Sequence, residues 1–468
     1  MLLSGRKRSS LKEEPRLMQM LARRSDSRGR LSVSLIAIGC VLLGLLLRFL
    51  AREHATTDTI LYHVPWYIFA RDHGVGGLGE AFTNYTPFYS YLLLIMAQFD
   101  GLGQPLTLVK VMSFVFEFGN AIVVALIVWW ANKAPSRACI AFCCVWLAPT
   151  VIFNGALWGQ ADSVWTFFTL VSIAAFMQHR NGILPFAVAV AVKAQGVFLG
   201  PFVLGMMLRD KIHWTWLAAV PVVYAALAIP VVVAGRSIAS VFSIYIEQAD
   251  VFHRLTMNAA NIWVFAGSVP YQMGVAIGLV LAVLGGLALA ALLARSRREG
   301  PEFILLVACA SLMIMPYLLP KMHDRYFFAF EVASIGLACL NARYLPFPAI
   351  AQVSGVLSYL GFEREIVMGL LPAALCNTLL AIYLVLDLWH DESGFHFPKL
   401  AWLGYAASTA GLFAYLLLAD AGENMSLTYL LFTGLVVGTA LMVIKGSRCA
   451  SVPERSVAGS APGHPPVN

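Results

Sequence analysis

The sequence predicts an all-α protein that crosses a membrane many times. Hydrophobic residues fill 59% of the 468 positions and charged residues only 12%, and the mean hydropathy is +0.76. A soluble globular chain carries about 25% charged residues. Apolar runs follow one another along most of the chain, and a spanning helix needs about 20 mostly apolar residues. We therefore expect about 12–13 transmembrane helices, a broken or re-entrant helix pair and one interfacial helix.

The expected elements follow in order from the N-terminus. A polar, basic head (residues 1–30) precedes the first span, Leu31–Leu50. The mixed loop after it, residues 51–106, contains the apolar patch Phe88–Phe99, which is too short to span and predicts a helix at the membrane interface. Further spans are expected at Thr107–Trp130, Ala138–Phe153, Ser163–Met177, Trp214–Ala234, Val269–Leu293, Phe303–Leu319, Tyr326–Leu340, Leu345–Leu360, Val367–Leu388, Leu400–Leu418 and Leu427–Ile444.

The distribution of positive charge predicts the orientation. Cytoplasmic loops are rich in Lys and Arg, so the basic head and the C-terminus are placed in the cytoplasm. The net charge of +7 then reflects orientation and not binding of nucleic acid. We divide the chain into the head, a transmembrane module at residues 31–344, C-terminal helices at residues 345–445 and a cytoplasmic tail at residues 446–468. The basic cytoplasmic turns are Ala131–Arg137, His179–Asn181, Leu208–Lys211 and Ala294–Glu299, and the external loops are residues 51–106, 154–162, 235–268 and 320–325.

This orientation requires one irregular segment, because Ile183–Met207 must enter and leave the membrane on the same side. Its natural break is Lys193-Ala-Gln195-Gly196. Broken helices are tolerated in membranes where the freed backbone lines protein or a wet cavity. We therefore expect Lys193 and Gln195 to face a cavity. A glutamine at position 193 is neutral and cheaper to bury, so the sequence predicts that Lys193→Gln leaves the fold at least as stable.

Unusual polar groups gather in the external loops. An ionisable group at membrane depth costs about 2.5–3.5 kcal/mol on insertion scales, so such groups suggest function. A carboxylate can act as a general base and cations can hold a phosphate, which suits a polar substrate with an anionic group. The residues are Asp58, Asn84, Tyr85, Trp158, Gln160, Asp162, His253, Asn258, Asn261, Trp263, Lys321, His323, Asp324 and Arg325.

Structural roles stay open for several of these residues. Trp158 can be an aromatic anchor at a span end. Gln160 and Asp162 can cap the helix that follows, where an acid near the N-terminus gains about 0.3–1 kcal/mol. Lys321 and Arg325 can extend their charged ends to the membrane interface.

Other polar groups are interpreted as structural. Lys110 and Glu117 are seven positions apart on one helix face, which indicates a structural polar contact. The eight cysteines include no CxxC pair and are expected to be packing residues. Asp58, His323 and Asp324 can in principle hold a divalent metal, although no spacing requires one.

A series of short motifs points to a family. The motifs are Asp58, Pro65-Trp66, Tyr85-Thr-Pro87-Phe-Tyr89, Trp158–Ser163, Lys193-Ala-Gln195, Asn258–Trp263 and Met322–Tyr326. In this order they resemble the bacterial integral-membrane glycosyltransferases related to GPI mannosyltransferase II, within the GT-C superfamily. The resemblance covers Asp58 to Glu331. Ala194 stands where proline is usual in that family, and Asp324 stands where glutamate is usual.

The resemblance implies a GT-C-like fold and an inverting hexosyltransferase in the bacterial inner membrane, within the cell envelope. Such an enzyme moves mannose or another hexose from a polyprenyl-phosphate carrier to a lipid or glycan acceptor on the non-cytoplasmic face. It implies no cofactor and leaves metal dependence open. The implied general base is Asp58. The implied sugar-binding residues are Trp66, Tyr85, Trp158, Gln160, Asp162, Gln195, Asn258 and Asn261, and the implied phosphate-binding residues are Lys193, His323 and Arg325.

A transporter or a flippase for lipid-linked sugars is the alternative from another class. It shares many spans, a broken helix and a buried lysine. Inverted internal repeats would favour it, but the polar motifs crowd the first two thirds of the chain and Leu345–Ile444 is almost featureless. A non-catalytic assembly subunit is a third interpretation, favoured only if the acids prove dispensable.

Overall fold

The protein is an all-α, multi-pass membrane protein. Its computed structural model describes residues 33–210, 212–250, 252–363 and 369–389. Within them, seven helices are long and apolar enough to cross a membrane, or eight if one bent pair counts as a single span. The seven are Val33–Leu50, Pro105–Asn132, Trp214–Val233, Tyr271–Arg295, Pro301–Leu318, Ala342–Phe362 and Leu370–Trp389.

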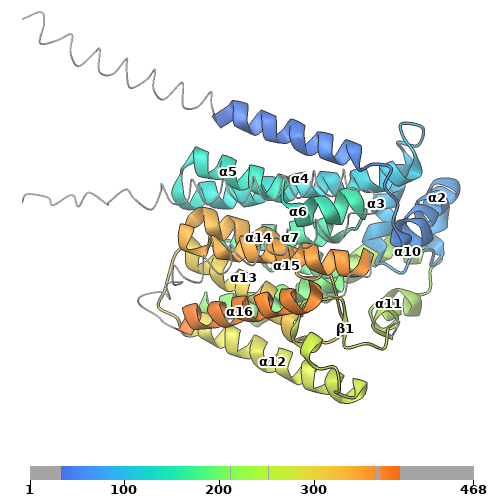
Figure 1. The fold of residues 1–468 in the computed structure, drawn as a ribbon. Helices are drawn as coiled ribbons and strands as arrows, with labels where there is room; N and C mark the ends of the chain where they lie inside the picture. The colour runs from blue at the N-terminus through green and yellow to red at the C-terminus, as the bar shows by residue number, and fades with distance from the viewer. Residues whose placement is uncertain (1–32, 211, 251, 364–368, 390–468) are drawn as a thin grey trace, which may run out of the picture.

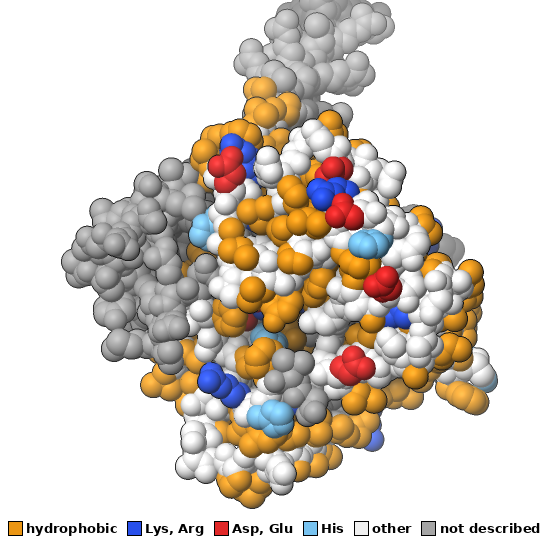
Figure 2. All heavy atoms as spheres, turned by 90° about the vertical axis from the view of Figure 1, so that its right-hand side faces the viewer, with side chains coloured by type: hydrophobic (Ala, Val, Ile, Leu, Met, Phe, Trp, Pro, Cys, Tyr) orange, Lys and Arg blue, Asp and Glu red, His pale blue; other side chains and the backbone are white. Residues whose placement is uncertain are grey.

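The long helices run lengthwise through the molecule, as α4, α12 and α16 show in Figure 1. The shorter elements α2, α11 and β1 lie together at one end of this bundle, which is the face drawn in Figure 2. The elements are α2 (Val64–His73), α3 (Pro87–Ala97), α4 (Pro105–Asn132), α5 (Pro135–Trp146), α6 (Pro149–Val151), α7 (Asp162–Met177), α8 (Ile183–Val192), α9 (Gly200–Arg209), α10 (Ala219–Val233), α11 (Ile238–Asp250), β1 (Thr256–Met257), α12 (Tyr271–Arg295), α13 (Pro301–Leu318), β2 (Met322–His323), α14 (Phe328–Leu340), α15 (Pro346–Glu363) and α16 (Leu370–Trp389).

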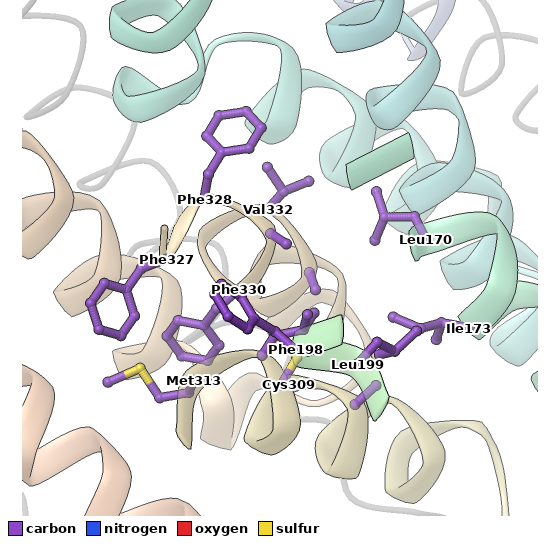
Figure 3. Close-up of a cluster of buried hydrophobic side chains, with 14 of the residues drawn as sticks. Leu170, Ile173, Phe198, Leu199, Cys309, Met313, Phe327, Phe328, Phe330 and Val332 are labelled. Carbon is purple, nitrogen blue, oxygen red and sulfur yellow. The ribbon is translucent and has the colours of Figure 1, made fainter. Parts of the chain in front are cut away.

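The centre of the bundle is built on α7, α13 and α14. Of the most apolar window of α13, 83% is buried inside the protein, against 28% for α12, so α13 is a core helix and α12 a peripheral one. Figure 3 shows part of this packing, with Ile173 of α7 and Cys309 of α13 beside Leu199 and Phe198. Leu170 of α7, Met313 of α13, and Phe328 and Val332 of α14 belong to the same buried cluster. Inside a membrane the alternative surroundings are lipid tails, so close packing between the helices stabilises these contacts, and not escape from water.

The number of spans is smaller in the described residues than the sequence predicts. The predicted spans Ser163–Met177 and Tyr326–Leu340 form α7 and α14, which have only 16 and 13 residues. Both helices are apolar because protein covers them on most sides. A helix covered by protein and a helix covered by lipid have the same hydropathy, so the sequence does not distinguish them. The predicted span Ala138–Phe153 is bent by 43° where α5 gives way to Pro149. The last two predicted spans, Leu400–Leu418 and Leu427–Ile444, lie outside the described residues.

The predicted break in Ile183–Met207 is confirmed. Helix α8 ends at Val192, Lys193 is extended (φ −155°, ψ 139°), and one tight helical stretch, Ala194–Leu199, leads into α9. Gly196 is required at this turn, because a Cβ there would lie 2.5 Å from the backbone nitrogen of Val190. The predicted interfacial patch Phe88–Phe99 forms α3, which begins at Pro87 and buries Tyr89 and Leu93.

Lys110 and Glu117 both have structural roles, but with separate partners. Lys110 Nζ donates to the carbonyl of Ala51 (2.9 Å), just after the Val33–Leu50 helix. Glu117 forms a fully buried ion pair with Arg48, with 2.6 Å between Oε2 and Nη2. Both therefore fix the first helix against α4. The described cysteines are all free thiols.

Candidate functional site

The predicted motif residues converge at the end of the bundle that carries α2 and β1. Strand β1 pairs in parallel with β2, which leads directly into Asp324 and Arg325. The first loop brings Asp58, the loop before α7 brings Gln160 and Asp162, and the break after α8 brings Lys193. Two of the predicted basic turns meet elsewhere: Arg209 Nη2 donates to the carbonyl of Arg298 (2.7 Å). In Figure 1, the end of α12 that leads to this turn points away from α2 and β1.

Asp162 is the hub of the charged cluster. Its Oδ1 accepts from Lys193 Nζ (2.6 Å) and from Trp165 Nε1 (3.1 Å). Its Oδ2 accepts from Asn154 Nδ2 (3.0 Å) and lies 3.4 Å from Arg325 Nε. The side chain is fully buried. Asp162 is the first residue of α7, so its carboxylate also lies at the positive end of that helix, as the structural alternative expected. Its hydrogen bonds and ion pairs, however, join it to side chains of other segments as well.

Asp58 is the acid in this cluster that stays accessible. Its side chain is 19% exposed, whereas those of Asp162 and Asp324 are fully buried. Gln160 Nε2 donates to Asp58 Oδ2 (2.8 Å), and Arg325 Nη1 lies 3.9 Å from the same oxygen. Figure 2 shows this face hollowed near its centre, with acidic and histidine side chains visible inside the hollow. A carboxylate held in this way can accept a proton from a ligand that reaches it from water.

Gln160 connects Asp58 to the first-loop tyrosine motif. Tyr85 Oη donates to Gln160 Oε1 (3.4 Å), and Ser113 Oγ donates to the Gln160 carbonyl (2.6 Å). Lys193 Nζ lies 5.3 Å from the centre of the Tyr85 ring. Gln160 is itself fully buried, so its amide holds Asp58 in one orientation.

Aromatic rings form one wall beside Asp58. Trp66 stacks on His63 with ring centres 5.4 Å apart, and it lies 5.4 Å from Tyr85. His63 Nδ1–H donates to the carbonyl of Gly159 (2.9 Å). Burial lowers the pKa of His63 to about 4, so its ring is neutral at pH 7. Gly159 has φ +66°, a conformation that favours glycine, and a Cβ there would lie 3.2 Å from Thr59.

The end of β2 and the residues that follow it supply Arg325 and two groups with displaced pKa values. The Asp324 amide donates to the Met257 carbonyl (3.0 Å), which fixes the segment to β1. Burial raises the pKa of Asp324 to about 7 and lowers the pKa of His323 to about 3. His323 is therefore neutral at pH 7, and it adds no positive charge for a phosphate.

The predicted phosphate-binding cations are already paired with acids. Lys193 pairs with Asp162, and Arg325 lies within 4 Å of carboxylates of Asp58, Asp162 and Asp324. Each cation keeps 10% of its side chain exposed. The site is therefore a network of two cations and three acids with limited access, and an anion that binds here must compete with protein carboxylates for both cations.

Other predicted site residues are part of the scaffold around this network. Trp158 is buried, with its ring centre 5.2 Å from those of Tyr359 and Phe362. Asn261 Nδ2 donates to the carbonyls of Pro316 near the end of α13 and of Leu319 just after it, and its Oδ1 accepts from the Trp263 amide. Asn261 is fully buried, and these contacts hold the loop against α13.

Two predicted sugar-binding residues lie outside the hydrogen bonds and ion pairs of Asp58. Asn258 has φ +60° and bridges to His323 beside β2. Gln195 is buried, and its Oε1 has no hydrogen-bond partner among the described residues. Gln195 Oε1 is thus a free acceptor that lies two residues after Lys193.

Sequence reasoning missed several residues that hold the site. Asn154 Nδ2 reaches both Asp162 Oδ2 and Tyr359 Oη, each at 3.0 Å. Trp165 and His63 were also not predicted as site residues. Asn154 lies next to the polar run before α7, so its position gave a signal, whereas Tyr359 lies in an apolar helix 205 residues away and gave none. Within the described ranges, no three or more His, Cys, Asp or Glu side chains form a group that could hold a metal ion.

Comparison with models of known protein families finds no match, and no curated protein is detectably similar to the chain. The fold and the site define the protein as a helical multi-pass membrane protein with a buried charge network at one end. Its family is a proposal that rests on the motif series and on the geometry above.

Proposed function

We propose that the protein is an inverting, GT-C-type membrane glycosyltransferase that moves a hexose from a polyprenyl-phosphate carrier to a lipid or glycan hydroxyl. The observation that carries this proposal is Asp58: an accessible carboxylate, oriented by Gln160 and adjacent to Arg325. The motif series from Asp58 to Glu331 supports the donor class. The non-cytoplasmic location of the site follows from the predicted orientation, and the bacterial inner membrane follows from the family resemblance.

The reaction needs one base and a leaving phosphate. Asp58 takes the proton of the acceptor hydroxyl while that oxygen forms a bond to the anomeric carbon of the donor. The bond from the anomeric carbon to the phosphate oxygen breaks in the same step, and the lipid phosphate leaves with the electron pair. A single displacement needs no second carboxylate, in contrast to glycoside hydrolysis.

Lys193 and Arg325 are the groups suited to the leaving phosphate. Cations placed where negative charge develops stabilise the transition state. Both side chains keep some exposure, and both are held by Asp162. On binding, the donor phosphate would share these cations with Asp162. The aromatic wall of Trp66 and Tyr85 can pack against a sugar ring.

The experiment is a transfer assay on the purified protein in proteoliposomes, with polyprenyl-phosphate mannose and polyprenyl-phosphate glucose as donors. Asp58→Asn is expected to lower turnover by about 100- to 10,000-fold while donor binding persists. The matched control is Asp72→Asn, because Asp72 lies in the same loop but is 49% exposed and pairs only with its neighbour Arg71. An Asp58→Asn variant with more than about a tenth of wild-type turnover would remove the base assignment.

A flippase for lipid-linked sugars is the second candidate, favoured by the buried ion pair at a helix break. Lys193 and Asp162 sit where α8 stops and α7 begins. Discontinuous helices with buried charges are typical of transporters. The same proteoliposomes separate the candidates: a flippase moves the labelled donor to the other leaflet with its sugar–phosphate bond intact, whereas a transferase breaks that bond.

A further inference from the structure

Helix α11 carries an apolar stripe that no part of the described protein covers. Ile238, Phe242 and Ile246 are 61%, 51% and 74% exposed. They recur every four residues, so they share one face of the helix. Large apolar side chains grouped on one exposed face indicate a contact surface, whereas scattered ones do not.

The other faces of α11 are accounted for. Val241 and Ile244 are buried and fix the helix to the bundle, with Val241 packed in the cluster around Tyr224 of α10. Tyr245 Oη donates to the Val190 carbonyl of α8 (2.6 Å), and the Gln248 amide donates to the Asn84 carbonyl.

A third face of α11 is polar and exposed, with Ser243 donating to Glu247. The helix is therefore anchored on one side, and its exposed surface is divided between an apolar stripe and a polar strip. A helix that lies wholly inside the hydrocarbon would expose apolar residues alone, and so would lack the polar strip. A helix surrounded by water would not expose the apolar stripe. A surface divided in this way is typical of a helix at the boundary between bilayer and water.

The stripe lies close in sequence to an exposed apolar surface of α10. That helix belongs to the candidate span Trp214–Val233, of which only 17% is buried, and Ile229 and Val233 near its end are 59% and 81% exposed. Helix α11 begins five residues after Val233. In Figure 1, α11 lies at the α2 and β1 end and is seen nearly end-on, whereas α4 and α12 run across the picture. It therefore crosses the direction of the spanning helices.

We infer that α11 is an interfacial helix whose Ile238, Phe242 and Ile246 side chains insert among the acyl chains at the edge of the bilayer. The occupant of this surface is membrane lipid. The inference rests on the helix faces and on closeness in sequence to α10, and it does not depend on the proposed transferase activity. Gln248 contacts Asn84, the neighbour of Tyr85, so the membrane surface would border the candidate site.

The test measures membrane depth on the full-length protein in phosphatidylcholine–phosphatidylglycerol vesicles. Nitroxide spin labels are placed on single cysteines introduced at Ile238, Phe242 and Ile246, with Glu247→Cys as the matched control on the polar strip. The signal of the similarly treated unsubstituted protein is subtracted as background. Power saturation then compares collisions with oxygen, which concentrates in the bilayer, and with a water-soluble nickel chelate.

We expect oxygen to reach the three stripe positions several-fold better than the nickel chelate, and the ratio to reverse at Glu247. Equal or greater access of the nickel chelate at the stripe would show that it faces water and would overturn the inference. Exclusion of both reagents from the stripe would show that protein covers it, from a second copy or another partner, and would overturn it as well. Three separate positions keep the test decisive if one variant fails to fold.

Discussion

The Lys193–Asp162 ion pair predicts a loss of stability that the sequence alone would not suggest. Lys193 Nζ lies 2.6 Å from Asp162 Oδ1, and the two side chains are 10% and 0% exposed. Lys193→Gln removes the charge that compensates a buried carboxylate. Breaking a buried pair by removal of one partner costs about 3–5 kcal/mol. Arg325, Trp165 and Asn154 still contact Asp162 in the variant, so we expect the lower end, about 3 kcal/mol.

This expectation replaces the opposite one drawn from the sequence. A neutral glutamine is cheaper to bury than a lysine when the lysine is considered alone, and that comparison predicted a fold at least as stable. The structure supplies the missing partner: Asp162 is buried together with Lys193. The relevant comparison is therefore between a buried ion pair and a buried, partly compensated carboxylate.

The assay is thermal unfolding of the purified protein in detergent. We expect Lys193→Gln to lower the Tm by about 5 °C, allowing for the small shift per kcal/mol in a large protein. The double variant Lys193→Gln with Asp162→Asn removes both charges and is expected to recover at least half of the loss. The matched control is Lys133→Gln, since Lys133 caps α4 and contacts the Trp129 ring, away from this network. A Lys193→Gln variant that melts with the wild type would refute the pairing argument.

Further predictions concern Arg325, Asp324 and the topology. Arg325→Lys keeps the charge but loses the planar guanidinium that reaches several carboxylates, so the transfer rate should fall at least about 10-fold and a donor-binding assay should show weaker affinity. Burial raises the pKa of Asp324 from its usual value of 3.8 to about 7. Between these two pH values the native state therefore binds more protons than the unfolded state. The free energy of unfolding should fall as the pH rises through that window. Asp324→Asn should remove part of this decline, so its Tm should be higher than that of the wild type at pH 8 and similar at pH 5. A variant that is less stable than the wild type at both pH values would contradict this prediction. Cysteines placed at Leu102, which is 80% exposed in the predicted external loop 51–106, and at the exposed Arg297 should react with an impermeant reagent from opposite sides of the membrane. Labelling of both from one side would contradict the predicted orientation.

The sequence by itself determined the class of the protein and one local feature of the site. Composition and successive apolar runs predict a helical multi-pass membrane protein, because avoidance of water is a property of each segment by itself. The break at Lys193 was also predictable, since a lysine followed by glycine in an apolar run is a local signal. The grouping of Asp58, Gln160, Asp162, Lys193 and Arg325 followed from placing their loops on one side of the membrane.

Only the tertiary structure decided what each buried group contacts. Hydropathy indicated that α7 and α14 leave water, but it did not show that they are short helices of 16 and 13 residues surrounded mostly by protein. The periodicity that placed Lys110 and Glu117 on one face could not show that Glu117 pairs with Arg48, 69 residues away. A local pattern records that a side chain leaves water, but the free energy of a buried charge depends on the partner that meets it, and that partner is chosen by packing between distant segments.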